Sequence, residues 1–388
     1  MDLRIGGLVL AIGLALGACG GAAAPASSPA PASPSGKPSA AASAPASKPA
    51  TSAAPSAAAS AASAKPAASA AASAAGTEVK IGLSTPTPEN LPLWTAKEKG
   101  FDKSNGLNFT IASFEGGSKG LEALLGGSID VMDVGLASVV IGNSRGASFR
   151  SIASSGLASP FIITGAKGIT ADNAKDKLKG GKVGISSFGS ESDVAVSLYL
   201  NKIGLARDKD VTIVQVGGTA TRLTALLSGA IGAGPLLGPD FIAAQDQGLT
   251  KLYDLSELPN WVYDTLVVTQ PEIQNKKPML LSLLKSVEEG NYYSRAHPDE
   301  AKKVLAAQFK QTDPKLTNAS YDEFIKVSRV DLDFTTPAIE SVLQVLPTVV
   351  KDVNLKRTNP SDYVDTGLID QLKSSGDLDR LKKQYGIS

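Results

Sequence analysis

The sequence has almost no cysteine or histidine: its 388 residues include one of each, Cys19 and His297. One cysteine cannot close a disulfide within the chain, and one histidine argues against a zinc enzyme or a Ser-His-Asp hydrolase. No His, Cys or carboxylate cluster has the spacing of metal ligands, so we expect neither a metal nor a cofactor. His297 stands before a proline and a helical pattern, which predicts a surface residue at a helix start.

An excess of charge of one sign is also lacking. The chain has 38 Lys and Arg against 37 Asp and Glu, a net charge of +1, and no block of like charge stands out after the N-terminal region. A nucleic-acid surface would need a basic stripe, so nucleic acid is not expected as a partner. The same balance gives no sign of a surface for anionic membranes.

The N-terminus has the pattern of an export signal. Arg4 precedes an apolar run over residues 5–16 that is too short to span a bilayer comfortably. Leu16-Gly17-Ala18-Cys19 follows, and small residues before a cysteine resemble the lipobox at which bacterial lipoproteins are cleaved. We predict a lipoprotein signal peptide over 1–19, a lipidated Cys19 and membrane contact through that lipid anchor alone. The alternative is an ordinary signal peptide with a chance cysteine.

Residues 20–76 contain only Ala, Ser, Pro, Gly, Lys and Thr. A segment without large apolar side chains cannot bury enough surface to offset the entropy of ordering it. We therefore predict a disordered tether, which would let the folded part move off the membrane surface and stay near it.

The rest of the chain contains an internal repeat. Residues 79–146 and 181–248 align without a gap, and Leu121–Ile129 (LEALLGGSI) matches Leu223–Ile231 (LTALLSGAI). Both copies show the same order of short apolar strand, hydroxyl-rich loop, helix, strand, Gly-Gly loop, helix and strand. Alternating strands and helices with short loops predict a mostly parallel sheet in each copy. The predicted fold class is α/β, with two similar lobes that face each other.

Hydroxyl side chains mark the predicted helix starts. Thr87 before a proline is typical of an N-cap, and Ser190 with Asp193 resembles a capping box. Ser118 and Thr219 follow the two Gly-Gly pairs and are interpreted as further caps.

The segment after residue 248 has no match in the repeat. An extended stretch is predicted over residues 261–269 (WVYDTLVVT). Helical patterns follow over 278–310, 335–351 and 368–385, and these helices are expected to complete the first lobe. The predicted domains are the signal peptide 1–19, the tether 20–76, a discontinuous lobe 1 over 77–165 and 272–388, and lobe 2 over 166–271.

Three stretches are similar to one family: Leu91–Phe101, Leu124–Val131 and Lys177–Ile185. Together with the export signal and the two lobes, they resemble the substrate-binding component of an ABC importer. Within that class the chain is similar to the nitrate, sulfonate, taurine and thiamine-pyrimidine group of type II periplasmic binding proteins. The resemblance implies hinge crossovers near 155–168 and 260–271.

The resemblance also implies a function. A small solute is trapped between the lobes by hinge closure and delivered to an ABC permease and its ATPase, by a monomer outside the cytoplasm. One departure is Gly232, where the family usually carries Asp, so the pocket wall over 232–235 is expected to differ.

In open α/β sheets, ligands bind beyond the carboxyl ends of the strands, at helix N-termini. Loops at those ends supply hydroxyls and backbone N–H groups that can hold an oxyanion without a basic residue. The predicted ligand-binding residues of lobe 1 are Ser84, Thr85, Glu89, Asn90, Glu115, Gly117, Ser118 and Ser138. Those of lobe 2 are Ser187, Phe188, Gly189, Ser190, Gly218, Thr219 and Asp240.

Acidic residues outnumber basic ones near these loops. The acids are Glu89, Glu115, Glu191, Asp193 and Asp240, and the bases are Lys119 and Arg222. This balance favours a ligand with an amine, an amidine or a neutral heterocycle, such as a pyrimidine precursor or an aminosulfonate. The alternative is that the acids only complement helix dipoles at N-termini.

Two other classes of function are considered. A lipid-anchored solute sensor or adhesin would use the same fold without transport. An enzyme that makes the thiamine pyrimidine is disfavoured, because relatives with that reaction depend on a cysteine-rich motif and on histidines that this sequence lacks. Solute binding rather than catalysis is the predicted function.

Overall fold

The computed structural model describes residues 76–387 apart from 259, 351–352 and 354. The predicted signal peptide, the lipidated Cys19 and the tether up to residue 75 lie outside the described residues. In the described part of the chain, no helix is both long and apolar enough to cross a membrane.

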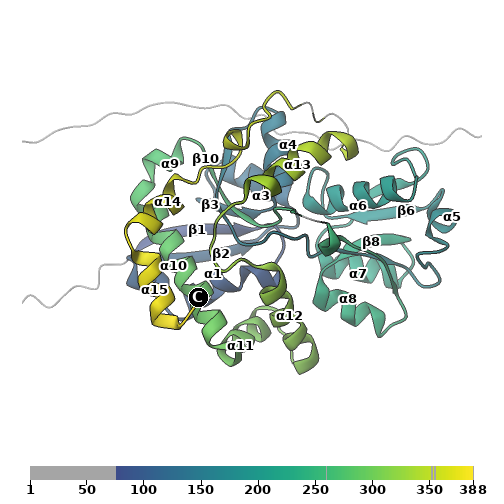
Figure 1. Cartoon of the computed structure of the whole chain (residues 1–388). Coiled ribbons are helices and arrows are strands. Elements are labelled where there is room, and N and C mark those ends of the chain that lie inside the picture. The colour runs from purple at the N-terminus through teal and green to yellow at the C-terminus, as the bar shows by residue number, and fades with distance from the viewer. Residues whose placement is uncertain (1–75, 259, 351–352, 354, 388) are drawn as a thin grey trace, which may run out of the picture. The chain divides into compact units, whose positions relative to one another are not determined.

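A first five-stranded sheet is built mainly from the N-terminal copy of the repeat, at the left of Figure 1. Its strands are β1 (Thr77–Leu83), β2 (Leu107–Ser113), β3 (Val131–Val134), β4 (Phe149–Ser154) and β10 (Thr265–Thr269). They lie in the order β2-β1-β3-β10-β4, and β10 is antiparallel to both of its neighbours. All residues of β3 and β4 are buried, as expected for strands covered on both faces.

The second sheet repeats this arrangement. Its strands are β5 (Ile162–Gly165), β6 (Lys182–Ile185), β7 (Thr212–Gln215), β8 (Ala233–Leu236) and β9 (Thr250–Asp254). The order is β7-β6-β8-β5-β9, and β5 is the antiparallel strand. The predicted α/β class with two mostly parallel sheets is confirmed.

The helices of the two copies correspond as well. α3 (Gly117–Leu125) corresponds to α7 (Thr219–Leu227), and α4 (Leu136–Ser144) corresponds to α8 (Gly238–Gln245). Each pair begins at positions that the ungapped alignment matches, so the predicted repeat is confirmed. The other helices before β10 are η1 (Pro88–Asn90), α1 (Leu91–Glu98), α2 (Phe101–Ser104), α5 (Ala174–Leu178), α6 (Glu191–Lys202) and η2 (Leu255–Glu257).

Two crossovers connect the sheets, and each ends a few residues earlier than predicted. The chain passes from β4 to β5 over residues 155–161 and returns from β9 to β10 over residues 255–264. The division at residues 165 and 271 places β5 in lobe 1 and β10 in lobe 2. In the structure, β5 belongs to the second sheet and β10 to the first. The reason is strand pairing, because β5 is inserted between β8 and β9, and β10 between β3 and β4.

The C-terminal segment is mostly helical. Its helices are α9 (Glu272–Asn275), α10 (Lys277–Ala296), α11 (Pro298–Gln308), α12 (Pro314–Val327), α13 (Thr336–Val349), η3 (Pro360–Asp362), α14 (Gly367–Ser374) and α15 (Asp377–Tyr385). α10 packs along α1, and Gly290 permits this approach because a Cβ there would overlap the Pro92 carbonyl oxygen. The predicted helix over 278–310 is divided at the exposed His297, where Pro298 begins α11, so the predicted helix-start role of His297 is confirmed.

Two of these helices also reach the second lobe. α12, which the sequence patterns did not predict, packs against α8, and α13 packs against both α4 and α6. The C-terminal segment therefore packs on both lobes and bridges them.

Candidate functional site

Loops from the two lobes meet at the ends of their strands, as the sequence predicts. The Ser118 hydroxyl of α3 lies 2.9 Å from the Ser187 hydroxyl, which follows β6, and it also donates to the Phe188 carbonyl oxygen at 2.8 Å. The loop before α3 is equally close to the second lobe, because a Cβ at Gly116 would lie 3.1 Å from the Ser186 hydroxyl. The structure thus brings together predicted residues from both lobes.

The hydroxyls at the two Gly-Gly pairs are not helix caps, which corrects the sequence interpretation. Gly116 and Gly218 occupy the N-cap positions of α3 and α7, and neither helix has a side-chain cap. Ser118 and Thr219 lie inside the first turns instead. Ser118 is therefore free to bond across the lobes, and the Thr219 hydroxyl accepts a hydrogen bond from Arg222 at 3.2 Å.

The predicted capping box at α6 is also absent. Ser190 has the extended backbone of an N-cap, but its hydroxyl bonds to the hydroxyls of Ser186 and Ser192 rather than to a backbone N–H of the helix. Asp193 accepts from the Gly189 N–H at 2.8 Å and pairs with Arg207 at 2.8 Å. These contacts hold the 186–193 loop in a fixed, buried network within the second lobe.

Glu191 reaches from the second lobe to the N-terminus of α4 in the first lobe. Its Oε1 accepts from the Ala137 N–H at 2.9 Å, and its Oε2 lies 3.4 Å from the Trp261 indole nitrogen. Gly135 is required for this contact, because a Cβ there would overlap the Glu191 carboxyl group. Burial raises the pKa of Glu191 to about 8.

A matching contact lies at the corresponding helix of the other lobe. Glu323 of α12 packs against Gly238, the first residue of α8, where a Cβ would overlap its carboxyl group. The Glu323 Oε1 is buried without a hydrogen-bond partner, and burial raises the pKa of Glu323 well above its usual value. Each of the two equivalent helix N-termini therefore faces a glutamate from outside its own lobe's repeat copy.

Three further carboxyl groups, which we call the acid cluster, lie together: Glu89, Asp133 and Asp264, each at most 2% exposed. Both Glu89 oxygens and the Asp133 Oδ1 lack a hydrogen-bond partner among the described residues. The Asp264 Oδ2 accepts from the Thr87 hydroxyl at 3.1 Å, and the Asn90 side-chain oxygen accepts from the Thr87 N–H at 2.8 Å. Burial raises the pKa of Glu89 to about 7 and that of Asp133 to about 8.

A buried arginine stands on the lobe 2 side. Arg222 donates to the carbonyl oxygens of Pro235 at 2.8 Å and Gly217 at 2.6 Å, and its guanidinium carbon lies 5.9 Å from the Phe161 ring centroid. Burial lowers its pKa to about 10. Its charge also lowers the pKa of the largely buried Asp240, although burial raises that pKa more. Arg222 is thus held by backbone acceptors of its own lobe.

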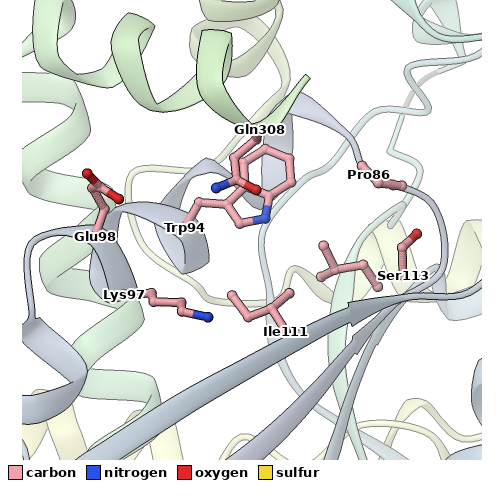
Figure 2. Close-up of a pocket in the computed structure, with 8 residues that line it drawn as sticks. Pro86, Trp94, Lys97, Glu98, Ile111, Ser113 and Gln308 are labelled. Atoms are coloured by element: carbon pink, nitrogen blue, oxygen red, sulfur yellow. The ribbon is translucent and has the colours of Figure 1, made fainter. Parts of the chain in front are cut away.

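Three cavities lie near the predicted loops. One of about 340 Å³ is lined by side chains of the first lobe, and Figure 2 shows Lys97 extending toward Ile111 below the Trp94 ring. It contains none of the predicted ligand-binding residues. A second, of about 470 Å³, is lined by Ser118, Ser138 and Gly189, among others. The third, of about 110 Å³, lies between the lobes.

The interlobe cavity of about 110 Å³ is lined by Pro86 and Pro88 next to η1 and by Pro239 and Asp240 of α8. Its lining includes Pro88, the residue before Glu89, but no residue of the acid cluster. In the described part of the chain, no group of three or more His, Cys, Asp or Glu side chains is arranged to hold a metal ion.

The other predicted residues are less engaged. Ser84 and Thr85 are half-buried, and the Thr85 hydroxyl bonds to the Ser84 carbonyl oxygen. Glu115 is exposed and lies 3.9 Å from Lys119, and Phe188 is 49% exposed. A Cβ at Gly218 would meet open space, whereas one at Gly117 would press on Val134 and Ser138.

The expected change of the pocket wall at Gly232 is wrong. Gly232 precedes β8, at the end of the strand opposite the cleft, and a Cβ there would lie 2.9 Å from the Leu178 side chain. Residues 233–235 lie within β8 and pair regularly with β5.

Several residues of the interlobe region were missed by sequence reasoning. Asp133, Tyr263, Asp264 and Glu323 were not predicted, and Glu191 was noted only as a nearby acid. The available signal for Asp133 and Asp264 was an acidic residue inside an apolar, strand-like run (VMDV and WVYDTLVV).

The comparisons with known proteins agree on the fold. YtlA of Bacillus subtilis (strain 168), named only as a candidate binding protein, is 23% identical over 261 residues, which cover 64% of this chain and 76% of YtlA. A solved structure from Bordetella bronchiseptica RB50 has a TM-score of 0.69 at 24% identity and covers 80% of this chain and 98% of its own. The alkanesulfonate-binding protein SsuA from Xanthomonas axonopodis pv. citri, bound to MOPS, has a TM-score of 0.62 at 17% identity, with coverage of 75% and 99%.

These similarities show that the chain has the fold of periplasmic solute-binding proteins, and YtlA and SsuA have names of binding proteins rather than of enzymes. The family model described as NMT1/THI5 like matches residues 87–301, more than half of the sequence. The chain therefore belongs to the NMT1/THI5-like family.

Proposed function

We propose that this chain is the extracytoplasmic solute-binding lipoprotein of an ABC importer. It traps a small organic or oxyanion solute, of the sulfonate, taurine, nitrate or pyrimidine-precursor kind, between its lobes by hinge closure. It then delivers the solute to a membrane permease that works with an ATPase. The protein acts as a monomer and is held at the membrane by a lipid on Cys19.

The observation that carries this proposal is the meeting of loops from the two lobes, each at the carboxyl end of a strand. Ser118 follows the carboxyl end of β2 in the first sheet, Ser187 follows that of β6 in the second, and the two hydroxyls lie 2.9 Å apart. Two lobes joined by two crossovers can open around a solute and close on it. The membership in a family with solute-binding relatives supports the same function.

The second candidate is a lipid-anchored solute sensor or adhesin without transport, for which the same cleft would serve. An enzyme of pyrimidine synthesis is less well supported, because the sequence lacks the cysteine-rich motif and the histidines on which such enzymes depend.

The proposal is tested first by thermal unfolding of the full chain with a panel of solutes. The panel holds alkanesulfonates, taurine, nitrate, bicarbonate and hydroxymethylpyrimidine. A solute at 100 times its Kd should stabilise the protein by about 2.7 kcal/mol, and Ser187→Ala should weaken its binding by about 1 kcal/mol. Binding that is unaffected by substitutions in both lobes would contradict the interlobe site.

Uptake separates import from sensing. Cells that lack this protein should take up the confirmed solute more slowly, and the wild-type gene should restore uptake. Unchanged uptake of a solute that binds tightly would favour the sensor or adhesin function instead.

A further inference from the structure

The region between the lobes has many acids and few bases. Glu89, Asp133, Asp264, Glu191 and Glu323 are all buried or carry a buried carboxyl oxygen, and no ion pair between described residues includes any of them. Arg222 is already bonded to carbonyl oxygens of its own lobe. Buried carboxyl groups without a cationic partner are costly, so they need a functional or structural reason.

The two positions best suited to an anion are already occupied. A helix N-terminus attracts negative charge through its free N–H groups and its dipole. The N-terminus of α4 is covered by Glu191, whose Oε1 accepts from Ala137, and that of α8 is covered by Glu323. An oxyanion could bind there only after displacing one of the protein's own carboxyl groups.

The groups between the lobes that remain without partners are mostly carboxyl oxygens, together with the Ser138 hydroxyl, which can donate or accept. Both oxygens of Glu89 and the Oδ1 of Asp133 are buried and unpartnered among the described residues, and Asp264 lies beside them. The interlobe cavity of about 110 Å³ is lined by Pro88, the residue before Glu89, and by Asp240 of the other lobe. A bound group that completes this site has to donate hydrogen bonds and balance negative charge.

We propose that the cleft selects a solute bearing an ammonium or amidinium group, whose N–H donors bind Glu89, Asp133 and Asp264. This inference rests on the proposed function and narrows its solute class. Glu191 and Glu323 add to the selection because they occupy the two helix N-termini, from which an anion would have to displace them.

The proposal predicts that binding couples to pH. The acid cluster itself comes from η1 (Glu89), β3 (Asp133) and the second crossover (Asp264). The other titratable or charged groups of this region are Tyr263 from the same crossover, Glu191 from α6, Arg222 from α7, Asp240 from α8, and Glu323 and Lys326 from α12. Burial raises the pKa of Glu89 to about 7 and that of Asp133 to about 8. A cation binds the ionised carboxylates, so its affinity should rise from pH 6 to pH 8 and binding should release protons.

The test uses probes of equal shape and different charge. Benzamidine, benzamide and benzoate, and the smaller acetamidine, acetamide and acetate, are titrated calorimetrically into the full chain at pH 6, 7 and 8. The amidines should bind about tenfold or more tightly than the matched amides, as one charged hydrogen bond implies, and the acids should bind most weakly. Glu89→Gln and Asp133→Asn should each remove most of this preference, whereas Asp176→Asn, at an exposed position of α5, should keep it.

The outcomes separate this inference from the proposed function. Tighter binding of the acids, or equal binding of amidine and amide, overturns the inference and leaves a solute-binding protein. The inference is also overturned if a nitrate or sulfonate found in the thermal-unfolding screen binds equally well at pH 6 and at pH 8. If no amidine binds at all, the inference is wrong, and the uptake experiment alone then decides the proposed function.

Discussion

Glu191 offers a sharp test of the interlobe contact, through the substitution Glu191→Gln. The side chain is 8% exposed, accepts a hydrogen bond from Ala137 at 2.9 Å and has its pKa raised by burial to about 8. In the unfolded chain the same carboxyl group ionises at its usual pKa of 4.5. Between these two values the folded state keeps a proton that the unfolded state has lost.

The sign of the effect follows from this difference. The unfolded state binds fewer protons than the folded state between pH 5 and 8, so the stability of the wild type falls as the pH rises. The largest possible loss from this one group is about 1.4 kcal/mol per pH unit, or about 4 kcal/mol over the interval. Glutamine has the same shape, accepts from Ala137 through its one oxygen and cannot ionise, but its amide nitrogen cannot accept from the Trp261 indole N–H. Relative to the wild type, Glu191→Gln should therefore gain about 2–4 kcal/mol of stability between pH 5 and pH 8, after a pH-independent loss of about 1 kcal/mol at the Trp261 contact.

Urea unfolding of both proteins at pH 5, 6, 7 and 8 measures this difference directly. The other buried acids titrate in both proteins, so the difference between the two curves isolates Glu191. Asp176→Asn, which changes an exposed carboxyl group, controls for net charge and should give no pH-dependent difference. A constant difference across the pH range, or a variant less stable than the wild type at pH 8, would refute the reasoning.

Three further predictions concern the same region. Gly135→Ala should destabilise the closed arrangement by about 1–3 kcal/mol, because its Cβ overlaps Glu191, and small-angle scattering should then report a more open protein. Arg222→Met should lower the free energy of unfolding by about 3 kcal/mol or more, because three acceptors lose a buried charged donor; an unchanged urea midpoint would contradict this. In a double-mutant cycle, Ser118→Ala and Ser187→Ala should couple by about 0.5–1.5 kcal/mol in the affinity for a confirmed solute, and strict additivity would speak against their hydrogen bond.

Much of the fold could be predicted because the sequence carries the same pattern twice. The ungapped match of Leu121–Ile129 with Leu223–Ile231 corresponds to equivalent helices and to equivalent strand order in both sheets. The lobe boundaries were harder, since β5 and β10 are short apolar runs whose membership depends on pairing with distant strands. No local signal distinguishes the sheet that such a run will join.

The site was predicted less completely, and the reason is again nonlocal. The loops that follow the strands were identified, and Ser118 and Ser187 do meet. Whether they bind solute stays a prediction. The acid cluster was missed because Asp133, Asp264 and Glu89 are far apart in sequence and come together only through the sheet and the second crossover.

The helix α13 has a consequence for how the cleft can open. Its apolar side chains, including Ile339, Val342 and Leu346, join one core cluster with residues of α4 in one lobe and α6 in the other. If the lobes rotated about the crossovers as rigid bodies, α13 would separate from either α4 or α6. A strip of apolar surface would then be exposed to water. If the lobes open as proposed, α13 therefore has to stay packed on one lobe and shift along the other, or lose part of its apolar contact. Under the proposed function, the free energy of that rearrangement would contribute to solute affinity although α13 itself need not touch the solute.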